Sequence, residues 1–126
     1  MKKKKFSSLW KASKQPRKQR KYRYNAPLHI KHKMLAAHLS KELREKYKRR
    51  AIPLRKGDVV KIMRGEFKGK TGKVVLVNTK KMKVFVEGMQ RTRKDGTKIN
   101  VPLDPSKLQI ISLNLDDKKR LESIEK

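Results

Sequence analysis

Apolar residues recur at helical spacing in the segment from residue 25 to residue 50. Asn25 suits the N-cap of a helix there, and Pro27 suits its first turn. Ser40 can interrupt the pattern and cap a second short helix over residues 41–48. We expect the apolar face of this segment to pack on the rest of the domain. The residues spaced seven and four apart on that face are Leu28, Leu35, Leu39, Leu43 and Tyr47.

Residues 54 to about 111 contain short runs rich in β-branched and aromatic residues, which are typical of strands. Asp95-Gly96 predicts a hairpin with a type I′ turn. Several short strands in so few residues favour a small closed barrel, because closure removes exposed strand edges. Residues 116–126 predict a short C-terminal helix. The predicted strands are 58–63, 73–78, 82–87, 99–103 and 108–111.

The first 24 residues show neither a helical nor a strand period. They contain eleven Lys and Arg residues and no acid. Phe6, Trp10, Tyr22 and Tyr24 are interleaved with these cations. Alone, such a segment is expected to be disordered and to order on a partner, where its aromatic rings can stack on unpaired bases. The sequence therefore predicts a basic extension (1–24), a helical segment (25–50), a barrel (51–112) and a C-terminal tail or helix (113–126).

The 126-residue chain has a formal net charge of +27, which points to a polyanionic partner. Nucleic acid is the leading candidate, because neutralised phosphates release counterions. No apolar run approaches the ~18 residues of a spanning helix, and no apolar stretch follows the basic N-terminus, so we expect a soluble intracellular protein without membrane insertion. The absence of cysteine excludes thiolate metal sites, and His29, His32 and His38 lack nearby acids, so no metal site is expected.

The stretch 57–74 invites two interpretations. Residues 65–71 end in Gly-Lys-Thr, like the phosphate-binding loop of a nucleotide hydrolase, but only three residues separate Gly65 from Gly69 where that loop needs four. A β-branched run follows instead of a helix. The alternative is a tight connection between strands, in which Gly65, Gly69 and Gly72 permit left-handed backbone and let loop amides approach a phosphate. Phe67 would then stack on RNA or brace the loop on the barrel.

The stretch 57–77 resembles the KOW motif, an RNA-binding module of ribosomal proteins and some transcription factors. The matching positions are Asp58, Val60, Ile62, Gly65, Lys68-Gly69 and Gly72-Lys73-Val74. The flanking segments 16–29, 38–47, 94–97 and 102–107 are similar to the family of universal large-subunit ribosomal protein twenty-four in its archaeal form, whose eukaryotic counterpart is numbered twenty-six. A KOW transcription elongation or processing factor is the alternative, but it would need a further α/β domain ahead of the motif. A nucleotide-hydrolysing enzyme is a third class.

The resemblance implies a mainly β fold: an SH3-like KOW barrel with a basic N-terminal extension, one or two short helices before it and a short C-terminal helix. It implies a cytoplasmic structural constituent of the large subunit, not an enzyme, that binds the 5′ region of 23S rRNA early in assembly, near the polypeptide tunnel exit. Its partners would be large-subunit rRNA and neighbouring ribosomal proteins, with no cofactor and no small-molecule substrate. The residues expected at the rRNA are Arg17, Lys18, Arg20, Lys21, Tyr22, Arg23, Tyr24, Asn25, His29, Lys31, His32, Arg55, Lys56, Arg64, Lys68, Gly69, Lys70, Thr71, Lys73, Arg91, Arg93, Lys94 and Lys98.

Overall fold

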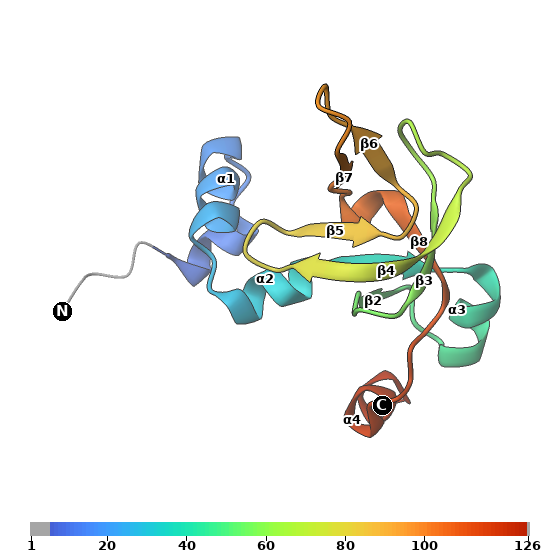
Figure 1. Cartoon of the computed structure of the whole chain (residues 1–126). Helices are drawn as coiled ribbons and strands as arrows, with labels where there is room; N and C mark the ends of the chain where they lie inside the picture. Colours follow the sequence, from blue (N-terminus) through green and yellow to red (C-terminus); the bar gives the residue numbers. More distant parts are fainter. Residues whose placement is uncertain (1–5, 126) are drawn as a thin grey trace.

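The computed structural model describes residues 6–125, and the lysine run at residues 2–5 of the expected extension lies outside this range. Two helical elements of the extension come first, and the strands follow (Figure 1). The elements in chain order are η1 (Ser8–Ala12), α1 (Pro16–Asn25), α2 (Leu28–Met34), β1 (Ala36–Leu39), α3 (Lys41–Tyr47), β2 (Ala51–Pro53), β3 (Val59–Ile62), β4 (Thr71–Asn78), β5 (Lys83–Val86), β6 (Gln90–Thr92), β7 (Lys98–Asn100), η2 (Pro105–Lys107), β8 (Leu108–Ser112) and α4 (Lys118–Glu125).

Six strands form one mixed sheet in the order β2-β1-β8-β3-β4-β5, and β6 and β7 form a separate hairpin. Only β1 and β8 pair in parallel within this sheet. The outer edge of β5 is taken by Leu103, which exchanges two backbone hydrogen bonds with Val84 at 2.9 and 2.8 Å. The chain then runs through η2 into β8, which pairs with β3. This return path joins the two edges of the β3-β4-β5 unit, so the predicted mainly β fold with a small barrel is confirmed.

The core lies inside this barrel because the strands alternate apolar and polar positions. β3 buries Val60 and Ile62, and β8 buries Leu108 and Ile110, each of them at most 1% exposed. Such alternation fixes the strand register, since a slip of one residue would turn every core side chain to solvent.

The extension differs from the prediction of a disordered segment, because residues 16–25 are helical. Pro16 stands at the first helical position, where its missing N–H costs nothing, and the following Arg, Lys and Gln residues are good helix formers. Gln19 fixes η1 to this helix, since its Nε2 lies 2.6 Å from the Ser13 carbonyl and 3.1 Å from the Trp10 carbonyl. A charged run without apolar period can thus still be helical.

The expected helical segment 25–50 is interrupted by a strand, and this corrects the prediction. Residues 36–39 form β1 between β2 and β8, and they bury Ala37 and Leu39 with strand periodicity. Asn25 ends α1 instead of capping a helix, and Pro27 is the N-cap of α2. The predicted second helix is confirmed as α3, although Ser40 caps it without a side-chain hydrogen bond. The predicted apolar face of this segment is also not buried throughout, because Leu28 is 62% exposed.

The hairpin at Asp95-Gly96 is confirmed, but its turn type was predicted wrongly. Gly96 has φ +91°, whereas Asp95 is not among the described residues with positive φ, so the type I′ requirement of two positive angles is not met. The Gly96 amide donates to the Arg93 carbonyl at 3.0 Å, and the Arg93 amide donates to the Thr97 carbonyl at 2.8 Å. These contacts describe a three-residue loop, in which a left-handed glycine follows a tight turn.

The C-terminal helix is confirmed as α4, and a buried ion pair fixes it to the barrel. The two terminal nitrogens of Arg120 lie 2.7 and 2.6 Å from the two carboxylate oxygens of Asp58. Asp58 is fully buried and Arg120 is 4% exposed. Asp58 also accepts the backbone N–H groups of Arg55 and Asn114, and Ile124 is buried in the core. Among residues 6–125, no helix is both long and apolar enough to cross a membrane.

Candidate nucleic-acid interface

The loop between β3 and β4 is a compact turn held by its own backbone. Gly65 and Gly69 have φ of +93° and +87°, and nothing would meet a Cβ at either position, so the backbone angle is the reason for glycine. The Gly69 amide donates to the Ile62 carbonyl at 2.8 Å, and the Lys68 amide donates to the Gly65 carbonyl at 3.2 Å. The amides of Lys68 and Gly69 are therefore already used within the loop, and contact between the other loop amides and a phosphate stays a prediction.

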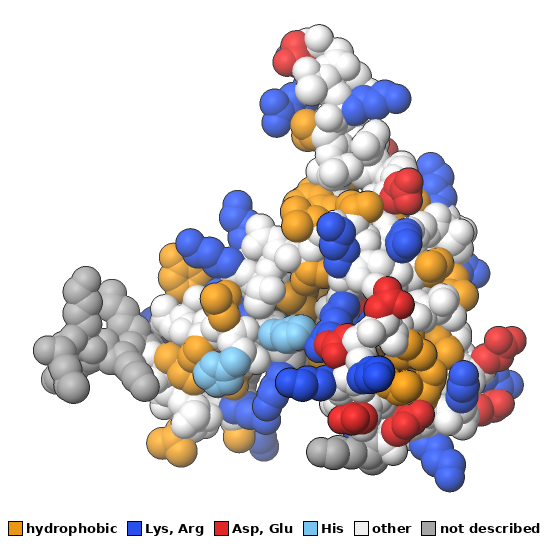
Figure 2. Space-filling model, turned by 60° about the horizontal axis from the view of Figure 1, so that its bottom comes forward, with side chains coloured by type: hydrophobic (Ala, Val, Ile, Leu, Met, Phe, Trp, Pro, Cys, Tyr) orange, Lys and Arg blue, Asp and Glu red, His pale blue; other side chains and the backbone are white. Residues whose placement is uncertain are grey.

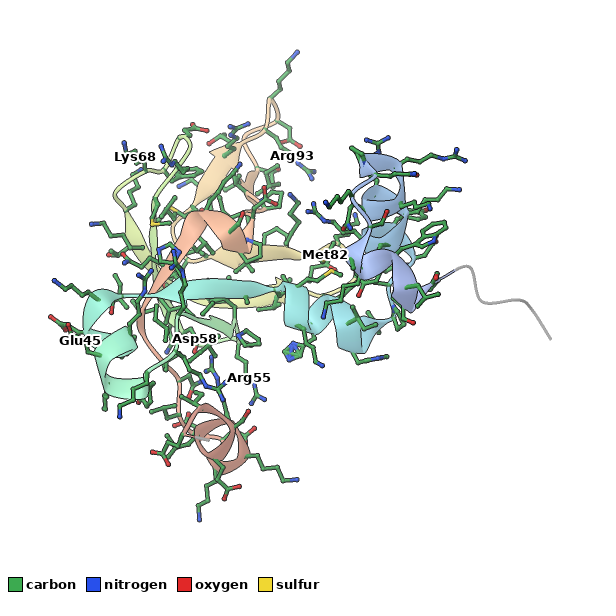
Figure 3. All side chains as sticks on the ribbon, turned by 180° about the vertical axis from the view of Figure 1, so that it is seen from behind. Glu45, Arg55, Asp58, Lys68, Met82 and Arg93 are labelled. Carbon is green, nitrogen blue, oxygen red and sulfur yellow. The ribbon has the colours of Figure 1, made fainter. Side chains whose placement is uncertain are left out.

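The charge of the loop is carried on its outside, while its aromatic ring faces inward. Phe67 is 7% exposed and belongs to the core cluster, so it braces the loop on the barrel. The ammonium of Lys70 lies over this ring, 5.2 Å from its centroid, which orients the side chain by a cation–π contact. Lys68 lies at the outer edge of the loop (Figure 3). The exposed polar residues here are Arg64, Glu66, Lys68, Lys70, Thr71 and Lys73.

Gly72 is required for a different reason from the one predicted. It has no left-handed φ angle, and it lies inside β4 opposite Val60. A Cβ at this position would lie 2.7 Å from Cγ1 of Val86 and 2.8 Å from the Glu87 carbonyl oxygen. Glycine here allows the close approach of β4 and β5, which is a packing requirement.

The loop is not a nucleotide-hydrolase phosphate loop. Such a loop leads into a helix whose N-terminus receives the phosphate. Here Thr71 begins the eight-residue strand β4, which pairs with β3 and β5. The Gly-Lys-Thr sequence therefore lies in a strand connection, as the spacing of the glycines had indicated.

The β6–β7 hairpin lies beside this loop and extends the basic surface. Arg91 joins them, because its Nη2 lies 2.5 Å from Oε2 of Glu66 and its Nε lies 3.1 Å from the same oxygen. Arg91 is thus partly neutralised, while Arg93, Lys94 and Lys98 are exposed and take part in none of the ion pairs within residues 6–125. Figure 3 shows Lys68 and Arg93 on the same side of the barrel. We name the residues of loop 64–73 and hairpin 91–98 the barrel surface.

A second basic surface lies on α1, at the other end of the molecule (Figure 1). Tyr24 is 83% exposed on it, so its ring is free to meet a base. Tyr22 is 8% exposed and its ring centroid lies 4.9 Å from that of Phe6, so most of its surface is covered within the protein, and its contact with RNA stays a prediction. A helical period explains the difference, because only one side of α1 packs on the protein. We name the cations of this helix the α1 surface: Arg17, Lys18, Arg20, Lys21 and Arg23.

Some predicted contact residues have structural roles instead. Lys31 is 9% exposed, and its ammonium donates to the Lys80 carbonyl at 2.9 Å, so it links α2 to the β4–β5 turn and is not at the surface. Arg55 pairs with Asp117 at 2.6 Å, and this hydrogen bond holds the pKa of the Asp117 carboxyl below its usual range. The other predicted residues between α1 and β3 are His29 and Lys56, both exposed, and Asn25 and His32, both half-buried.

Most exposed acidic side chains come from α3 and the C-terminal segment, whereas Glu66 and Asp95 lie on the barrel surface. Figure 2 shows red side chains concentrated on one side of the face that carries the C-terminal helix. The α3 helix contributes Glu42 and Glu45, and the C-terminal segment contributes four more exposed acids. The α1 surface contains no acid, and the two acids of the barrel surface are outnumbered by its cations, so a polyanion meets little repulsion at either surface. The four C-terminal acids are Asp116, Asp117, Glu122 and Glu125.

The structure also brings together residues that sequence patterns did not single out. Arg120 pairs with the Asp58 carboxylate. It lies in a segment where acidic and basic residues are balanced, and no sequence pattern there indicates this pair. Met34 and Met82 come from α2 and from the β4–β5 turn and line one cleft. The two methionines are far apart in the sequence and line the same cleft only in the folded chain. No local motif therefore predicts either the ion pair or the cleft. Among the described residues, no group of three or more His, Asp and Glu could hold a metal ion.

Comparison with known protein families gives one finding. The model of the family described as ribosomal proteins L26 of eukaryotes and L24 of archaea matches residues 13–126. The matched range takes in every element from α1 to α4, and with them both basic surfaces.

Proposed function

The chain belongs to the family of eukaryotic L26 and archaeal L24 ribosomal proteins, and on that premise we propose that it binds the 5′ region of large-subunit rRNA through the α1 surface and the barrel surface. Family membership makes it a structural protein of the large ribosomal subunit, with rRNA and ribosomal proteins as partners in the cytoplasm. The proposal includes an early step of subunit assembly and a position near the exit of the polypeptide tunnel.

The observation that carries the proposal is the separation of two exposed basic surfaces by the length of the barrel (Figure 1). Folded RNA is recognised by its shape and its phosphates, and two separated cation clusters can contact two helices or two turns of one helix. The buried ring of Phe67 anchors the backbone of loop 64–73 on the barrel. Phosphate contacts from an anchored loop fix the register of a protein on its nucleic acid, so this surface sets the orientation of the barrel while α1 adds affinity.

The test measures affinity for a transcribed 5′-domain rRNA fragment against salt concentration. Each phosphate contact contributes roughly 0.7 to 0.9 to the slope of log K against log salt. Changing the five α1-surface cations to Gln keeps helix propensity and the packing of Tyr22, and it should lower the slope by about 3 if most of them contact phosphates. The matched control changes five exposed lysines on the acid-rich side to Gln: Lys41, Lys46, Lys48, Lys118 and Lys119.

The control variant should leave the slope of log K against log salt nearly unchanged if the RNA contacts the α1 surface and the barrel surface. Equal losses in both variants would mean that net charge alone drives the interaction. A third variant, with Arg64, Lys68 and Lys70 changed to Gln, should weaken binding and shift the hydroxyl-radical footprint on the RNA, because the barrel surface sets orientation. An unaltered footprint would contradict that role.

A further inference from the structure

A cleft of about 1000 Å³ lies between the two helices of the N-terminal half and the tip of the β4–β5 hairpin. Residues of α1 and α2 line one wall, and residues 81–83 and 104–106 line the other. Figure 3 shows Met82 between the barrel and α1. The volume is at the upper end of the roughly 300–1,000 Å³ that small-molecule sites occupy. A cleft of this volume is comparable in size to the sites that hold small molecules.

The lining of the cleft combines apolar side chains with cations. The apolar part includes Tyr22, Ile30, Met34 and Met82. The cations at the cleft include Arg23 and Lys33, both exposed. The acid of the lining, Asp104, is paired with Lys83 and lies 3.5 Å from Lys107. The Lys83 hydrogen bond holds the pKa of Asp104 below its usual range, so the acid stays ionised and compensated by its own partners.

The wall at the tip of the β4–β5 hairpin contains a residue with an uncommon backbone conformation. The Met82 amide donates to the Thr79 carbonyl at 3.3 Å, and Met82 has φ +54°. Gly96 occupies the corresponding position in the β6–β7 hairpin, where its amide closes the same kind of turn onto Arg93. A residue with a side chain is uncommon in this left-handed conformation, and such strain gathers at ligand sites. The turn thus carries a methionine where backbone geometry favours glycine, and that side chain lines the cleft.

The width of the cleft is fixed by a buried contact. The Lys31 ammonium reaches from α2 to the Lys80 carbonyl in the turn, at 2.9 Å. Because Lys31 is 9% exposed, this charged hydrogen bond is sheltered from water and ties the two walls together. This contact joins α2 to the turn that carries Met82, so both sides of the cleft belong to one connected structure.

We propose that this cleft receives one unpaired nucleotide of the bound RNA, with its base against Met34 and Met82 and its phosphate at the cations of the rim. A base has an apolar face that stacks without regard to its identity, and its phosphate carries the negative charge that complements the rim. This inference rests on the proposed rRNA binding and adds a specific pocket for a single extruded base. A paired RNA helix does not offer a free base face, so the cleft selects a bulge, loop or strand end.

The first experiment uses full-length protein with ¹³C-labelled methionine methyl groups and AMP as the probe. A stacked base shifts nearby methyl resonances by its ring current, so Met34 and Met82 should shift with saturation at millimolar AMP. Met63 and Met89 do not line the cleft and act as internal controls. Ribose 5-phosphate carries the phosphate without the base and should shift these signals much less. Equal shifts at all four methyl groups, or none at Met34 and Met82, would overturn the proposal.

The second experiment compares matched variants on α2 with AMP and with the rRNA fragment. Ile30→Glu puts a carboxylate into the cleft, whereas Leu28→Glu adds the same charge at a site on α2 that does not line it. Ile30→Glu should weaken AMP binding about tenfold or more, a loss comparable to one stacked base, and Leu28→Glu should not. Met82→Gly removes one apolar wall and gives the turn its favoured residue, so it should weaken AMP binding while the fold is kept.

The two proposals fail in different ways. If wild-type protein binds the rRNA fragment with a steep salt slope and Ile30→Glu binds it as well as Leu28→Glu, the cleft proposal is wrong and rRNA binding stands. If the wild-type protein shows no salt-dependent affinity for the fragment, the proposed function itself is wrong. Circular dichroism of each variant separates a lost site from a lost fold.

Discussion

Replacing Arg120 by Met tests whether the buried ion pair holds the C-terminal helix on the barrel. The substitution removes the guanidinium and keeps a long apolar side chain. It takes away both hydrogen bonds to Asp58, at 2.7 and 2.6 Å, and the bond to the Asn114 carbonyl at 2.8 Å. The Asp58 carboxylate is left with two backbone N–H donors in a fully buried position.

The size of the effect follows from burial. Removing one partner of a buried ion pair costs about 3–5 kcal/mol, because the remaining charge is left uncompensated. A domain of this size has roughly 5–15 kcal/mol of stability, so the loss is a large part of the total. At roughly 3–5 °C per kcal/mol, the midpoint of thermal unfolding should fall by about 10–20 °C.

The control is the second Arg–Asp pair that joins the barrel to the C-terminal segment. Arg55 and Asp117 lie 2.6 Å apart with side chains 42% and 49% exposed. Exposed pairs contribute about 0–1 kcal/mol because water already solvates both ions. Arg55→Met should therefore lower stability by no more than about 1 kcal/mol. The two variants lose the same type of side chain and differ mainly in burial.

Urea unfolding followed by far-ultraviolet circular dichroism gives both free energies. A double variant, Asp58→Asn with Arg120→Met, should be more stable than Arg120→Met alone, since it removes the uncompensated charge. Equal losses for Arg120→Met and Arg55→Met would show that burial does not set the strength of the pair. If only α4 detaches, amide exchange should accelerate at Leu121 and Ile124 before the barrel strands exchange.

Two further predictions concern the barrel. Gly72→Ala should destabilise the fold by about 1–3 kcal/mol in urea unfolding, because its Cβ would lie 2.7 Å from a Val86 methyl and 2.8 Å from a backbone oxygen; a loss below about 0.5 kcal/mol would show that β5 yields easily. The pKa of His38 lies below its ordinary value of 6.5, first through burial and then through Arg44 and Arg50. The folded state thus binds the proton less well than the unfolded chain, so stability should decrease as pH falls from 6.5 through the lowered pKa, and His38→Gln should flatten that decrease.

The strands of the barrel could be predicted because their signal is local. β-branched runs and the positions of Gly65 and Gly69 depend on neighbouring residues, and the structure confirms strands at each predicted run except that the fourth, 99–103, is shorter and lies in residues 98–100. The cations of loop 64–73 and hairpin 91–98 are exposed as expected, since a short basic turn has no interior in which a charged side chain could be buried. Their contacts with rRNA stay predictions.

The errors concern side chains whose role depends on distant partners. The segment 36–39 reads as part of a helix by its spacing, but it becomes β1 because β2 and β8 offer it backbone partners on both sides. Lys31 looks like any cation of a basic helix until the Lys80 carbonyl is placed beside it. Tyr22 is 8% exposed, and its ring contacts that of Phe6. In each case the deciding contact is with a residue that is not adjacent in the sequence.

Composition and short-range pattern were enough to establish the charge, the strands β3, β4, β5, β7 and β8, and the family resemblance in the stretch from Gly57 to Val74, because each of these depends on residues that are close together in the chain. Only the folded arrangement shows which cations remain free. It also shows how the loop amides are used and where a cleft opens. Those properties arise when segments far apart in the chain meet and compete for the same hydrogen bonds and the same buried space. The pairing of Asp58 with Arg120, across a separation of 62 residues, is one such contact.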